Sequence, residues 1–332
     1  MKVLVTGATG LLGSNIVPLL LGQNYEVTAL VRSIPRGRQL FGYSIAYLEG
    51  DLGNVSKFEN ELRDFDTVIH CAAHYSQYYK DGNENTPFRI NLNGTKSLLN
   101  AAYSKGIRNF IYISSSGVLK TTNVVKPTNE NDPYDEDIED SYFQSKIVAE
   151  KEALKFARSH KDMRIIIILP SLMIGPNDFG PTPTGNFILS FLKKQIRFVL
   201  PGTMKIVDAR DVAGVVVKSI TKGKSGERYL VGGKQYPISK ILEILSEISG
   251  IPVPSKKLTP RKVLFMAHIM KFISKIKGKQ PPASLKLCVV KRLLKNFWYD
   301  STKAVNTFGI KFRPINDTLT DTVKWFQNAY MR

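Results

Sequence analysis

The chain has 332 residues, 43% of them apolar, which is enough to bury a substantial core in one large domain or in two. Its 47 Lys and Arg outnumber 28 Asp and Glu and give a formal net charge of +19, a field that attracts nucleic acids, anionic membranes and anionic cofactors alike. The basic residues are spread along the chain, and no zinc-finger, helix-turn-helix or RNA-binding signature accompanies them. We therefore expect no nucleic-acid partner.

The sequence also argues against export, membrane insertion and metal binding. Lys2 is followed at once by the strand-and-turn pattern VLVTG, without the apolar region and cleavage site of a signal peptide. The most apolar windows, 164–175 and 262–276, are short or interrupted by charge. Cys71 and Cys288 match neither a disulfide framework nor a metal-ligand spacing, which fits a reducing compartment. We expect a cytoplasmic protein that holds no metal.

The first half of the chain alternates strands and helices. Short, nearly continuous apolar runs predict strands of a parallel sheet that is buried on both faces. They lie at 2–6, 26–32, 44–50, 66–72, 109–115 and 164–170, and helical patterns lie between them at 10–22, 54–63, 87–105 and 141–159. This alternation predicts an α/β fold with a doubly wound parallel sheet of the Rossmann type.

The second half has a different character. Turn-rich stretches at 175–186 and 249–262 separate helices, with few strands among them. We interpret this half as a smaller, mostly helical domain that returns to the sheet near 205–232. The predicted organisation is a nucleotide-binding domain at 1–170, rejoined by about 205–232, and a C-terminal substrate-binding or lid domain formed by 171–204 and 233–332.

The first predicted strand is followed by TGATGLLG, residues 6–13, in which three glycines precede a helical pattern. In such a turn, backbone amides at the helix N-terminus bind a pyrophosphate. Gly7 permits the tight turn, Gly10 lets the backbone approach the phosphates, and Gly13 allows close helix–strand packing. The spacing Gly-x-x-Gly-x-x-Gly at the start of a βαβ pattern therefore predicts dinucleotide binding. The predicted cofactor contacts in this turn are Gly7, Thr9, Gly10, Leu11, Leu12 and Gly13.

The end of the second predicted strand, ALVRSIPRGR, indicates which dinucleotide binds. NAD favours an acidic residue there for the ribose 2′-hydroxyl, whereas NADP requires positive charge for the 2′-phosphate. Arg32 stands at that place, Arg36 and Arg38 follow, and no carboxylate competes. Because a guanidinium presents a planar fork to phosphate oxygens, we predict NADP(H), with NAD(H) as the alternative.

A tyrosine and a lysine follow in YFQSK, residues 142–146. Tyr142 and Lys146 are four residues apart in a helical pattern, so their side chains share one face. A nearby ammonium stabilises the phenolate and lowers a phenol pKa from its usual value of about 10 toward a working range. After a nucleotide-binding βαβ region and the serine-rich strand end ISSSG at 113–117, this pair indicates a proton-transferring site.

Further motifs occur in a fixed order along the chain. They are TGATGLLG, GDL (50–52), HCAA (70–73), NLNGT (91–95), SSSG, YFQSK, LPSLMIGPND (169–178), DARDVA (208–213) and the tail YDSTKAVNTFGIKFRPINDTLTDTVKWF. Over essentially its whole length the chain resembles the extended short-chain dehydrogenase/reductases of the NAD-dependent epimerase/dehydratase superfamily. Within them it is most similar to the dihydroflavonol-4-reductase-like and 3β-hydroxysteroid-dehydrogenase-like branch.

This resemblance implies a catalytic Ser–Tyr–Lys site. Tyr142 would donate a proton to the substrate carbonyl oxygen during reduction, and Lys146 would hold the nicotinamide ribose hydroxyls and lower the pKa of Tyr142. Ser116 would hydrogen-bond the substrate oxygen, with Ser115 as the alternative. Asn91 would support the hydrogen-bond network of the site, and capping of a helix start is the alternative for it. Hydride would pass directly from the nicotinamide, so the protein supplies orientation and electrostatics.

The resemblance implies further cofactor contacts at the ends of other strands. Asp51 and Leu52 would flank the adenine, Ala72 and Ala73 would line the cofactor after the fourth strand, and Pro170 would lie near the nicotinamide.

Nucleotide-sugar epimerases and dehydratases of the same superfamily are the alternative class. The resemblance implies that such enzymes keep NAD bound, often have an acidic residue where this chain has Arg32, and often place an arginine near Met204 and Lys205 to bind a diphosphate. These departures favour an NADPH-dependent reductase, or reverse dehydrogenase, of a ketone or aldehyde on a small lipophilic or aromatic substrate. A non-catalytic NADP-sensing protein is a second alternative, disfavoured by the complete Ser–Tyr–Lys set.

Ligands in open α/β sheets bind beyond the carboxyl ends of the strands. That position selects the loop HYSQYY at 74–79, the segment 171–173 and the region around 186–187. The three tyrosines indicate an aromatic-lined pocket, and a tyrosine-rich surface loop is the alternative. The predicted substrate contacts are His74, Tyr75, Ser171, Met173, Asn186 and Phe187, and we assign no catalytic role to His74.

The segment 255–297 contains two basic helical patterns that are apolar over much of their circumference, RKVLFMAHIMKFISKIKGK and SLKLCVVKRLLKNFW. They are expected to act as lid helices on the substrate pocket, which the resemblance favours, or to lie weakly on an anionic membrane and deliver a lipophilic substrate. The resemblance also implies a homodimer formed through the helices at 87–105 and 141–159.

Overall fold

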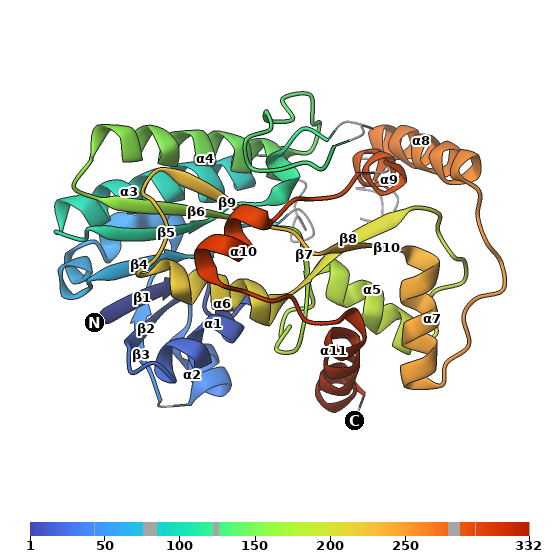
Figure 1. Ribbon diagram of the computed structural model, residues 1–332, viewed down its shortest axis with the longest axis horizontal. Coiled ribbons are helices and arrows are strands. Elements are labelled where there is room, and N and C mark those ends of the chain that lie inside the picture. Colours follow the sequence, from blue (N-terminus) through green and yellow to red (C-terminus); the bar gives the residue numbers. More distant parts are fainter. Residues whose placement is uncertain (43, 76–84, 122–125, 278–285, 296, 332) are drawn as a thin grey trace.

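The computed structural model describes residues 1–42, 44–75, 85–121, 126–277, 286–295 and 297–331. Its centre is a parallel sheet in which seven strands lie in the order β3-β2-β1-β4-β5-β6-β9 (Figure 1). The strands are β1 (Lys2–Thr6), β2 (Glu26–Val31), β3 (Ala46–Glu49), β4 (Thr67–His70), β5 (Asn109–Ile113), β6 (Arg164–Pro170) and β9 (Glu227–Val231). The order reverses between β1 and β4, so the sheet is doubly wound, as the sequence predicts.

Helices cover both faces of this sheet (Figure 1). One face carries α1 (Leu11–Leu21), α2 (Ile34–Phe41), α6 (Ala209–Ser219) and α10 (Thr302–Phe308), and the other carries α3 (Thr95–Ser104) and α4 (Ser141–Ser159). The two cores follow from the two-residue period of a strand: Val3 and Val5 of β1 point into the first core and Leu4 into the second.

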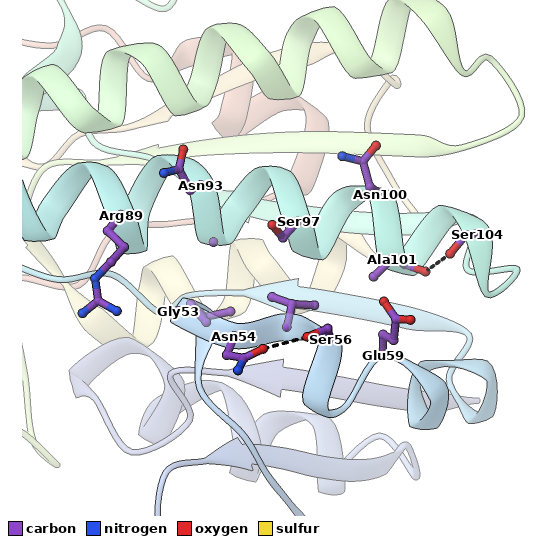
Figure 2. Close-up of a pocket in the computed structure, with 13 residues that line it drawn as sticks. Gly53, Asn54, Ser56, Glu59, Arg89, Asn93, Ser97, Asn100, Ala101 and Ser104 are labelled. Carbon is purple, nitrogen blue, oxygen red and sulfur yellow. Dashed lines mark hydrogen bonds between the residues drawn. The ribbon is translucent and has the colours of Figure 1, made fainter.

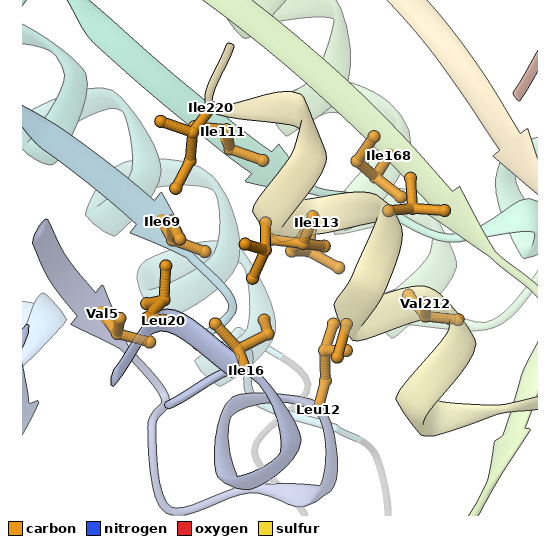
Figure 3. Close-up of a cluster of buried hydrophobic side chains, with 14 of the residues drawn as sticks. Val5, Leu12, Ile16, Leu20, Ile69, Ile111, Ile113, Ile168, Val212 and Ile220 are labelled. Atoms are coloured by element: carbon orange, nitrogen blue, oxygen red, sulfur yellow. The ribbon is translucent and has the colours of Figure 1, made fainter. Parts of the chain in front are cut away.

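The first core lies between the sheet and the helix pair α1 and α6, as Figure 3 shows. Ile16 of α1, Ile69 of β4, Ile111 of β5 and Val212 of α6 are all completely buried there. Full burial of each such side chain stabilises the fold by about 1.5–3 kcal/mol. The amino ends of α1 and α6 are thereby fixed against the carboxyl ends of the strands, where the sequence predicts the ligand site.

The second half of the chain builds a smaller lobe around a third core. It contains a second sheet of order β10-β8-β7 and helices packed beside it (Figure 1). Its elements are β7 (Leu172–Ile174), α5 (Pro183–Leu192), β8 (Thr203–Asp208), β10 (Lys234–Pro237), α7 (Ile238–Ser249), α8 (Pro260–Lys277), α9 (Leu287–Leu294) and α11 (Ile315–Tyr330). The chain returns to the large sheet through α6 and β9, whereas β8 belongs to the small sheet. The exact domain limits stay a prediction.

Some local elements differ from the expectation. The helix predicted at 54–63 is two short 3-10 helices, η1 (Leu52–Lys57) and η2 (Asn60–Asp64), because Asn54 leaves helical geometry at φ −151° and ψ 73°. The helix predicted at 87–105 begins as a π-helix, η4 (Phe88–Gly94), before α3. Helix α2 and the strands of the small sheet were not predicted, since they are short and carry little periodic apolar signal.

No helix within the described residues combines the length and the apolar composition needed to cross a bilayer. In the same residues, no group of three His, Cys, Asp or Glu side chains is placed to hold a metal ion.

The turn between β1 and α1 depends on two glycines for different reasons. Gly7 has a φ of +69°, and a Cβ on it would lie 2.6 Å from the Ala72 nitrogen. A Cβ on Gly13 would lie 2.3 Å from the Gly7 carbonyl oxygen and 2.6 Å from the Ala8 Cα. The first glycine therefore allows both the left-handed turn and the approach of β4, and the second lets α1 start directly against the turn.

We expect Gly13→Ala to lower the free energy of unfolding by about 1–3 kcal/mol, because the added methyl group meets backbone atoms that cannot move aside. The control is Gly214→Ala in α6, where no atom lies within 4 Å of the added Cβ, so stability should hold or rise. Urea unfolding measures both variants. Equal stability of the two would contradict this packing account.

Candidate active site

The glycine turn presents backbone amides to the carboxyl edge of the sheet. Gly10 is the N-cap of α1; its amide donates to the Gly7 carbonyl at 3.0 Å, and the first helical bond runs from the Ser14 amide to the Gly10 carbonyl at 2.9 Å. The amides of Leu11 and Leu12 precede that bond, so they are available to an anion, as is usual at a helix N-terminus. This bare, amide-lined turn fits the pyrophosphate of a dinucleotide.

A buried hydrogen-bond chain fixes the end of β4 beside this turn. His70 lies between two threonines, with Nδ1 2.7 Å from Thr6 Oγ1 and Nε2 3.0 Å from Thr95 Oγ1. Because the Thr95 hydroxyl donates to the Asn91 carbonyl at 2.6 Å, Nε2 of the ring carries the proton and Nδ1 accepts. Thr6 Oγ1 in turn accepts the Ala72 amide at 3.2 Å. The chain thus ties β1, β4 and α3 together with a neutral imidazole.

The electrostatic surroundings keep this imidazole neutral. Burial, followed by the nearby Lys146 ammonium, lowers the pKa of His70 to about 3. Burial also raises the pKa of the neighbouring Cys71 thiol to about 12, against a smaller opposing effect of Lys146. Neither group is therefore placed to exchange protons at neutral pH, and Ala72 and Ala73 follow them at the edge where the glycine turn lies.

The ends of β2 and β3 lie on the adenosine side of the predicted cofactor site. Arg32 follows β2 and is exposed, and Ser33 is the N-cap of α2 with no side-chain capping bond. Asp51 follows β3, and its carboxylate accepts the Gly53 amide at 2.6 Å while Leu52 is buried. The Arg32 guanidinium, the Ser33 hydroxyl and the N-terminus of α2 thus follow one another directly after β2. Ser33 was not among the cofactor contacts predicted from the sequence.

The three predicted catalytic residues lie on two neighbouring elements, the start of α4 and the short helix that follows β5. Tyr142 and Lys146 are one turn apart on α4, whose N-cap Asp140 accepts the Tyr142 amide at 3.0 Å. Ser116 begins the 3-10 helix η5 (Ser116–Val118) after β5. The ring of Phe143 lies against Gly117, where a Cβ would come within 2.0 Å of it. All three catalytic side chains are buried.

The Lys146 ammonium is held at the end of β5. It is 2% exposed and donates to the Ile113 carbonyl at 2.8 Å. Burial lowers the pKa of Lys146 to about 8, and smaller opposing effects of Cys71 and Glu150 limit that shift. The ammonium is therefore charged at neutral pH and titrates close to it.

The serine run after β5 separates into three roles. The Ser114 hydroxyl donates to the buried Glu150 carboxylate, and the Ser115 hydroxyl accepts the Gly117 amide at 3.1 Å. Within the described residues the Ser116 hydroxyl has no hydrogen-bond partner. It is thus the serine whose hydroxyl is available to a ligand, and the choice of Ser116 over Ser115 stays a prediction.

A second buried cluster, which the sequence did not reveal, supports α4 from behind. Glu150 lies one turn beyond Lys146, accepts the Tyr134 hydroxyl at 3.0 Å and pairs with Arg228 at 2.7 Å. Burial raises the pKa of Glu150, while Arg228 and the hydrogen bonds of Ser114 and Tyr134 lower it. The cluster joins α4 to β9 and to the loop after β5, so it fixes the helix that carries the catalytic pair.

Asn91 and Tyr75 position the loop that follows β4. The Asn91 amide accepts the His74 backbone amide at 2.7 Å and donates to the His74 carbonyl and to Ser145 Oγ, both at 3.0 Å. It therefore belongs to the hydrogen-bond network of the site and is not a helix cap. The Tyr75 ring lies 4.4 Å from the Tyr142 ring, centroid to centroid. Residues 76–79 of the predicted substrate loop lie outside the described residues.

The other predicted substrate residues lie on the segments that follow β6. Ser171 follows Pro170 at the end of β6 and its Oγ accepts the Gly233 amide at 3.1 Å. Met173 is on β7, Phe187 packs against the third core, and Asn186 is exposed with its amide on the Pro181 carbonyl at 2.8 Å.

Helix α9 brings an unpredicted cation to the site. Arg292 donates to the Gly117 carbonyl at 2.8 Å and to the Ser116 carbonyl at 3.3 Å, and its guanidinium lies 5.5 Å from the Phe143 ring centre. The sequence signal was only a basic helical pattern, which does not indicate where one arginine points.

A cavity of about 630 Å³ lies away from the catalytic residues, between η1 and the helices η4 and α3 (Figure 2). Its lining is mostly small and polar, with Arg89 at one end and Glu59 and Ser104 at the other. It contains none of the Ser–Tyr–Lys residues, so the chemistry of the site does not take place there. Leu52 is shared between this cavity and the predicted adenine side of the cofactor site.

The doubly wound sheet, the amide-lined glycine turn and the Tyr-x-x-x-Lys pair are together those of an extended short-chain dehydrogenase/reductase. The chain belongs to the NAD dependent epimerase/dehydratase family, whose model matches residues 3–232.

Individual relatives match nearly the whole chain. A candidate dihydroflavonol 4-reductase from Synechocystis sp. is 35% identical over 98% of this chain and 94% of its own length. Sterol demethylase protein B from Methylococcus capsulatus is 29% identical, with full coverage of both chains. The crystal structure of gox2253 superposes with a TM-score of 0.86 at 29% identity, covering 99% of this chain and 98% of the other.

The serine assignment gives a direct test. Ser116→Ala should lower kcat for carbonyl reduction about a hundredfold, because it removes a donor to the substrate oxygen, and leave cofactor affinity unchanged. Ser115→Ala should keep kcat and lose about 1 kcal/mol of stability with its capping bond. Steady-state kinetics and urea unfolding measure both. A larger loss of kcat in Ser115→Ala would reverse the assignment.

The neutral His70 predicts a specific pH dependence of stability. Its folded pKa lies below the unfolded value of about 6.5, so the unfolded chain binds more protons between about pH 3 and 6.5. The stability that His70 contributes is present above pH 6.5 and is lost as the pH falls. The difference in unfolding free energy between wild type and His70→Gln should therefore shrink from pH 7 toward pH 4. A constant difference would contradict a buried neutral imidazole.

Proposed function

We propose that the protein is an NADPH-dependent reductase of a ketone or aldehyde group on a small lipophilic or aromatic substrate. One observation supports the proposal: Tyr142 and Lys146 are buried one turn apart on α4, Lys146 is held on the Ile113 carbonyl at the end of β5, and Ser116 is buried shortly after the same strand. A bound nicotinamide supplies the hydride. Tyr142 gives a proton to the substrate oxygen, Ser116 orients that oxygen, and Lys146 keeps the phenol acidic.

The basic end of β2 supports NADP over NAD. Arg32 is exposed directly after the strand, Ser33 starts α2, and no carboxylate stands at the position where NAD is usually recognised. A 2′-phosphate there would accept from a guanidinium, a hydroxyl and helix amides together.

The surroundings of Lys205 support a reductase over a nucleotide-sugar epimerase. Lys205 is 5% exposed; its ammonium donates to Thr203 at 2.9 Å and to the Lys295 carbonyl at 3.3 Å, and it lies 3.7 Å from the Phe297 ring centre. An ammonium enclosed in this way, with its pKa lowered to about 8 by burial and Arg292, is poorly placed to bind a sugar diphosphate. The relatives also include epimerases: a Vibrio cholerae UDP-glucose 4-epimerase is 32% identical over 53% of this chain.

The names of the long-matching relatives point to the substrate class. They refer to a dihydroflavonol and to a sterol, both hydrophobic ring systems. Tyr75 on the Tyr142 ring and Phe143 beside Gly117 supply aromatic surface suited to such rings. We further propose a cytoplasmic location, and a homodimer through α3 and α4 stays a prediction.

Cofactor preference is tested on Arg32. Wild type should bind NADPH more tightly than NADH, and Arg32→Ala should lose at least about tenfold of that preference, because a charge-assisted contact to the phosphate disappears. Gln39→Ala, an exposed change further along α2, is the control. Isothermal titration calorimetry measures the affinity of each of the three proteins for each cofactor. Purification with NAD tightly bound, or an unchanged preference in Arg32→Ala, would favour the epimerase alternative.

The buried Lys146 predicts how cofactor binding depends on pH. Because its ammonium in the free protein has a pKa of about 8, NADPH affinity should fall as the pH rises through that value and the charge is lost. Lys146→Met should bind weakly and without this step. Fluorescence titration of NADPH from about pH 7 to about pH 10 measures it. Wild-type affinity that stays constant over this range would contradict the assigned contact.

A further inference from the structure

Helix α8 exposes an apolar face to solvent. Phe265 is 67% exposed, Phe272 65%, Ile269 40% and Ile273 37%. Their spacing of four, three and one residues places all four on one side of the helix. Two phenylalanines exposed to this degree on a single face form an unusual surface for a water-facing helix.

This face is not the one that holds α8 on the protein. Val263 and Ala267, on the opposite side of the helix, are buried against Leu287 and Val290 of α9. Figure 1 shows α8 at the edge of the molecule, with α9 beside it. The helix is therefore held on the protein by its inner side, while the outer apolar residues stay exposed to solvent.

The two chain segments that form this face carry charge of one sign, although Glu139 of another segment pairs with Lys271 at its edge. Residues 248–299 contain twelve Lys or Arg and no Asp or Glu, and residues 179–207 contain four and none. The basic residues form no single run, but in these two segments no acidic residue stands among them. Arg261 and Lys262 are exposed in the first turn of α8.

The neighbouring segment extends the same surface. Residues 256–258 are hydrogen-bonded to Val199 on both sides, at 2.9 and 3.0 Å, directly before α8. That pairing places the exposed Arg197 and Phe198 next to Lys256 and Lys257, which are also exposed. Apolar and basic side chains thus alternate over two adjoining segments.

We propose that this surface, formed by Phe265, Ile269, Phe272 and Ile273 of α8 with the flanking cations, docks on an anionic lipid bilayer. Apolar side chains of an amphipathic helix enter the boundary between headgroups and acyl chains, and each nearby Lys or Arg adds about 1 kcal/mol of attraction to an anionic leaflet. Two of the four exposed side chains are isoleucines, which offer no ring on which a nucleic-acid base could stack. A second copy of this chain would bring two strongly basic surfaces together, so charge complementarity selects the bilayer.

The docking surface is tied to the rim of the catalytic site. Lys271 of α8 pairs with Glu139 at 2.7 Å, directly before Asp140, the N-cap of the helix that carries Tyr142. Arg292 of α9 binds the Ser116 and Gly117 carbonyls. Docking would therefore bring the catalytic site close to the lipid. The consequence, that the carbonyl substrate is taken from the bilayer, rests on the proposed function, whereas docking itself does not.

Flotation with lipid vesicles tests the surface on the full chain. Wild type should float with vesicles of phosphatidylcholine containing about one-third phosphatidylglycerol, and much less with pure phosphatidylcholine. Phe265→Ser/Phe272→Ser and Arg261→Gln/Lys262→Gln should each weaken binding at least about tenfold. Leu19→Ser/Val148→Ser removes two other exposed apolar groups, from α1 and α4, and should bind as wild type does.

Three outcomes would overturn docking: no flotation of wild type, equal flotation of the phenylalanine pair variant, or sedimentation showing a dimer that this pair variant dissociates. Reduction of a water-soluble carbonyl compound by NADPH is measured in parallel and should be the same in wild type and the pair variant. Flotation without any such reduction upholds the surface and rejects the proposed function. Reduction without flotation upholds the proposed function and rejects the docking surface.

Discussion

An ammonium group that is almost completely removed from water must be held by acceptors or lose its proton, and Lys146 meets this constraint at one backbone carbonyl. Ile113 is the last residue of β5, and the parallel strands of the sheet end at a common edge. The end of β5 therefore places the Ile113 carbonyl at this edge. This hydrogen bond fixes the position of helix α4 relative to the sheet. The Asp140 cap at the start of the helix and the Glu150 cluster further along it stabilise the same position. Tyr142, one turn before Lys146, is placed by the same contacts.

Much of the architecture could be predicted because its signals are local. The strands β1 and β6 and the helices α1 and α4 agree with the sequence pattern almost to the residue, since buried parallel strands are continuous apolar runs and α4 has a clear helical period. The geometry of residues 52–64 and 88–94 could not be predicted in this way. There Asp51 caps the Gly53 amide, Asn54 leaves helical geometry, and Gly94 packs against Leu52. Apolar periodicity reports neither these local conformations nor that tertiary contact.

The residues of the candidate site also divide into those that the sequence identifies and those that only the fold reveals. Gly7, Gly13 and Lys146 could be identified from sequence because a backbone requirement or a fixed helical spacing gives them a recognisable pattern. His70, Glu150 and Arg292 could not. His70 is held by two threonines from distant segments, and Glu150 by partners on β9 and in the segment after β5. Arg292 reaches the site because α9 folds back over the serine run. Such residues stabilise the positions of the catalytic groups, and only the fold brings their partners together.

The central claim, net hydride transfer to a carbonyl carbon at Tyr142 and Lys146, is tested most directly with NADPH carrying deuterium at the transferred position of C4. A ring ketone is turned over and the product alcohol is analysed by mass spectrometry, for wild type and for Tyr142→Phe. The account predicts deuterium on the carbinol carbon and oxidised cofactor in solution for wild type, with at least about a hundredfold slower transfer in the variant. Retention of the label on a cofactor that stays bound, or equal transfer by Tyr142→Phe, would contradict it.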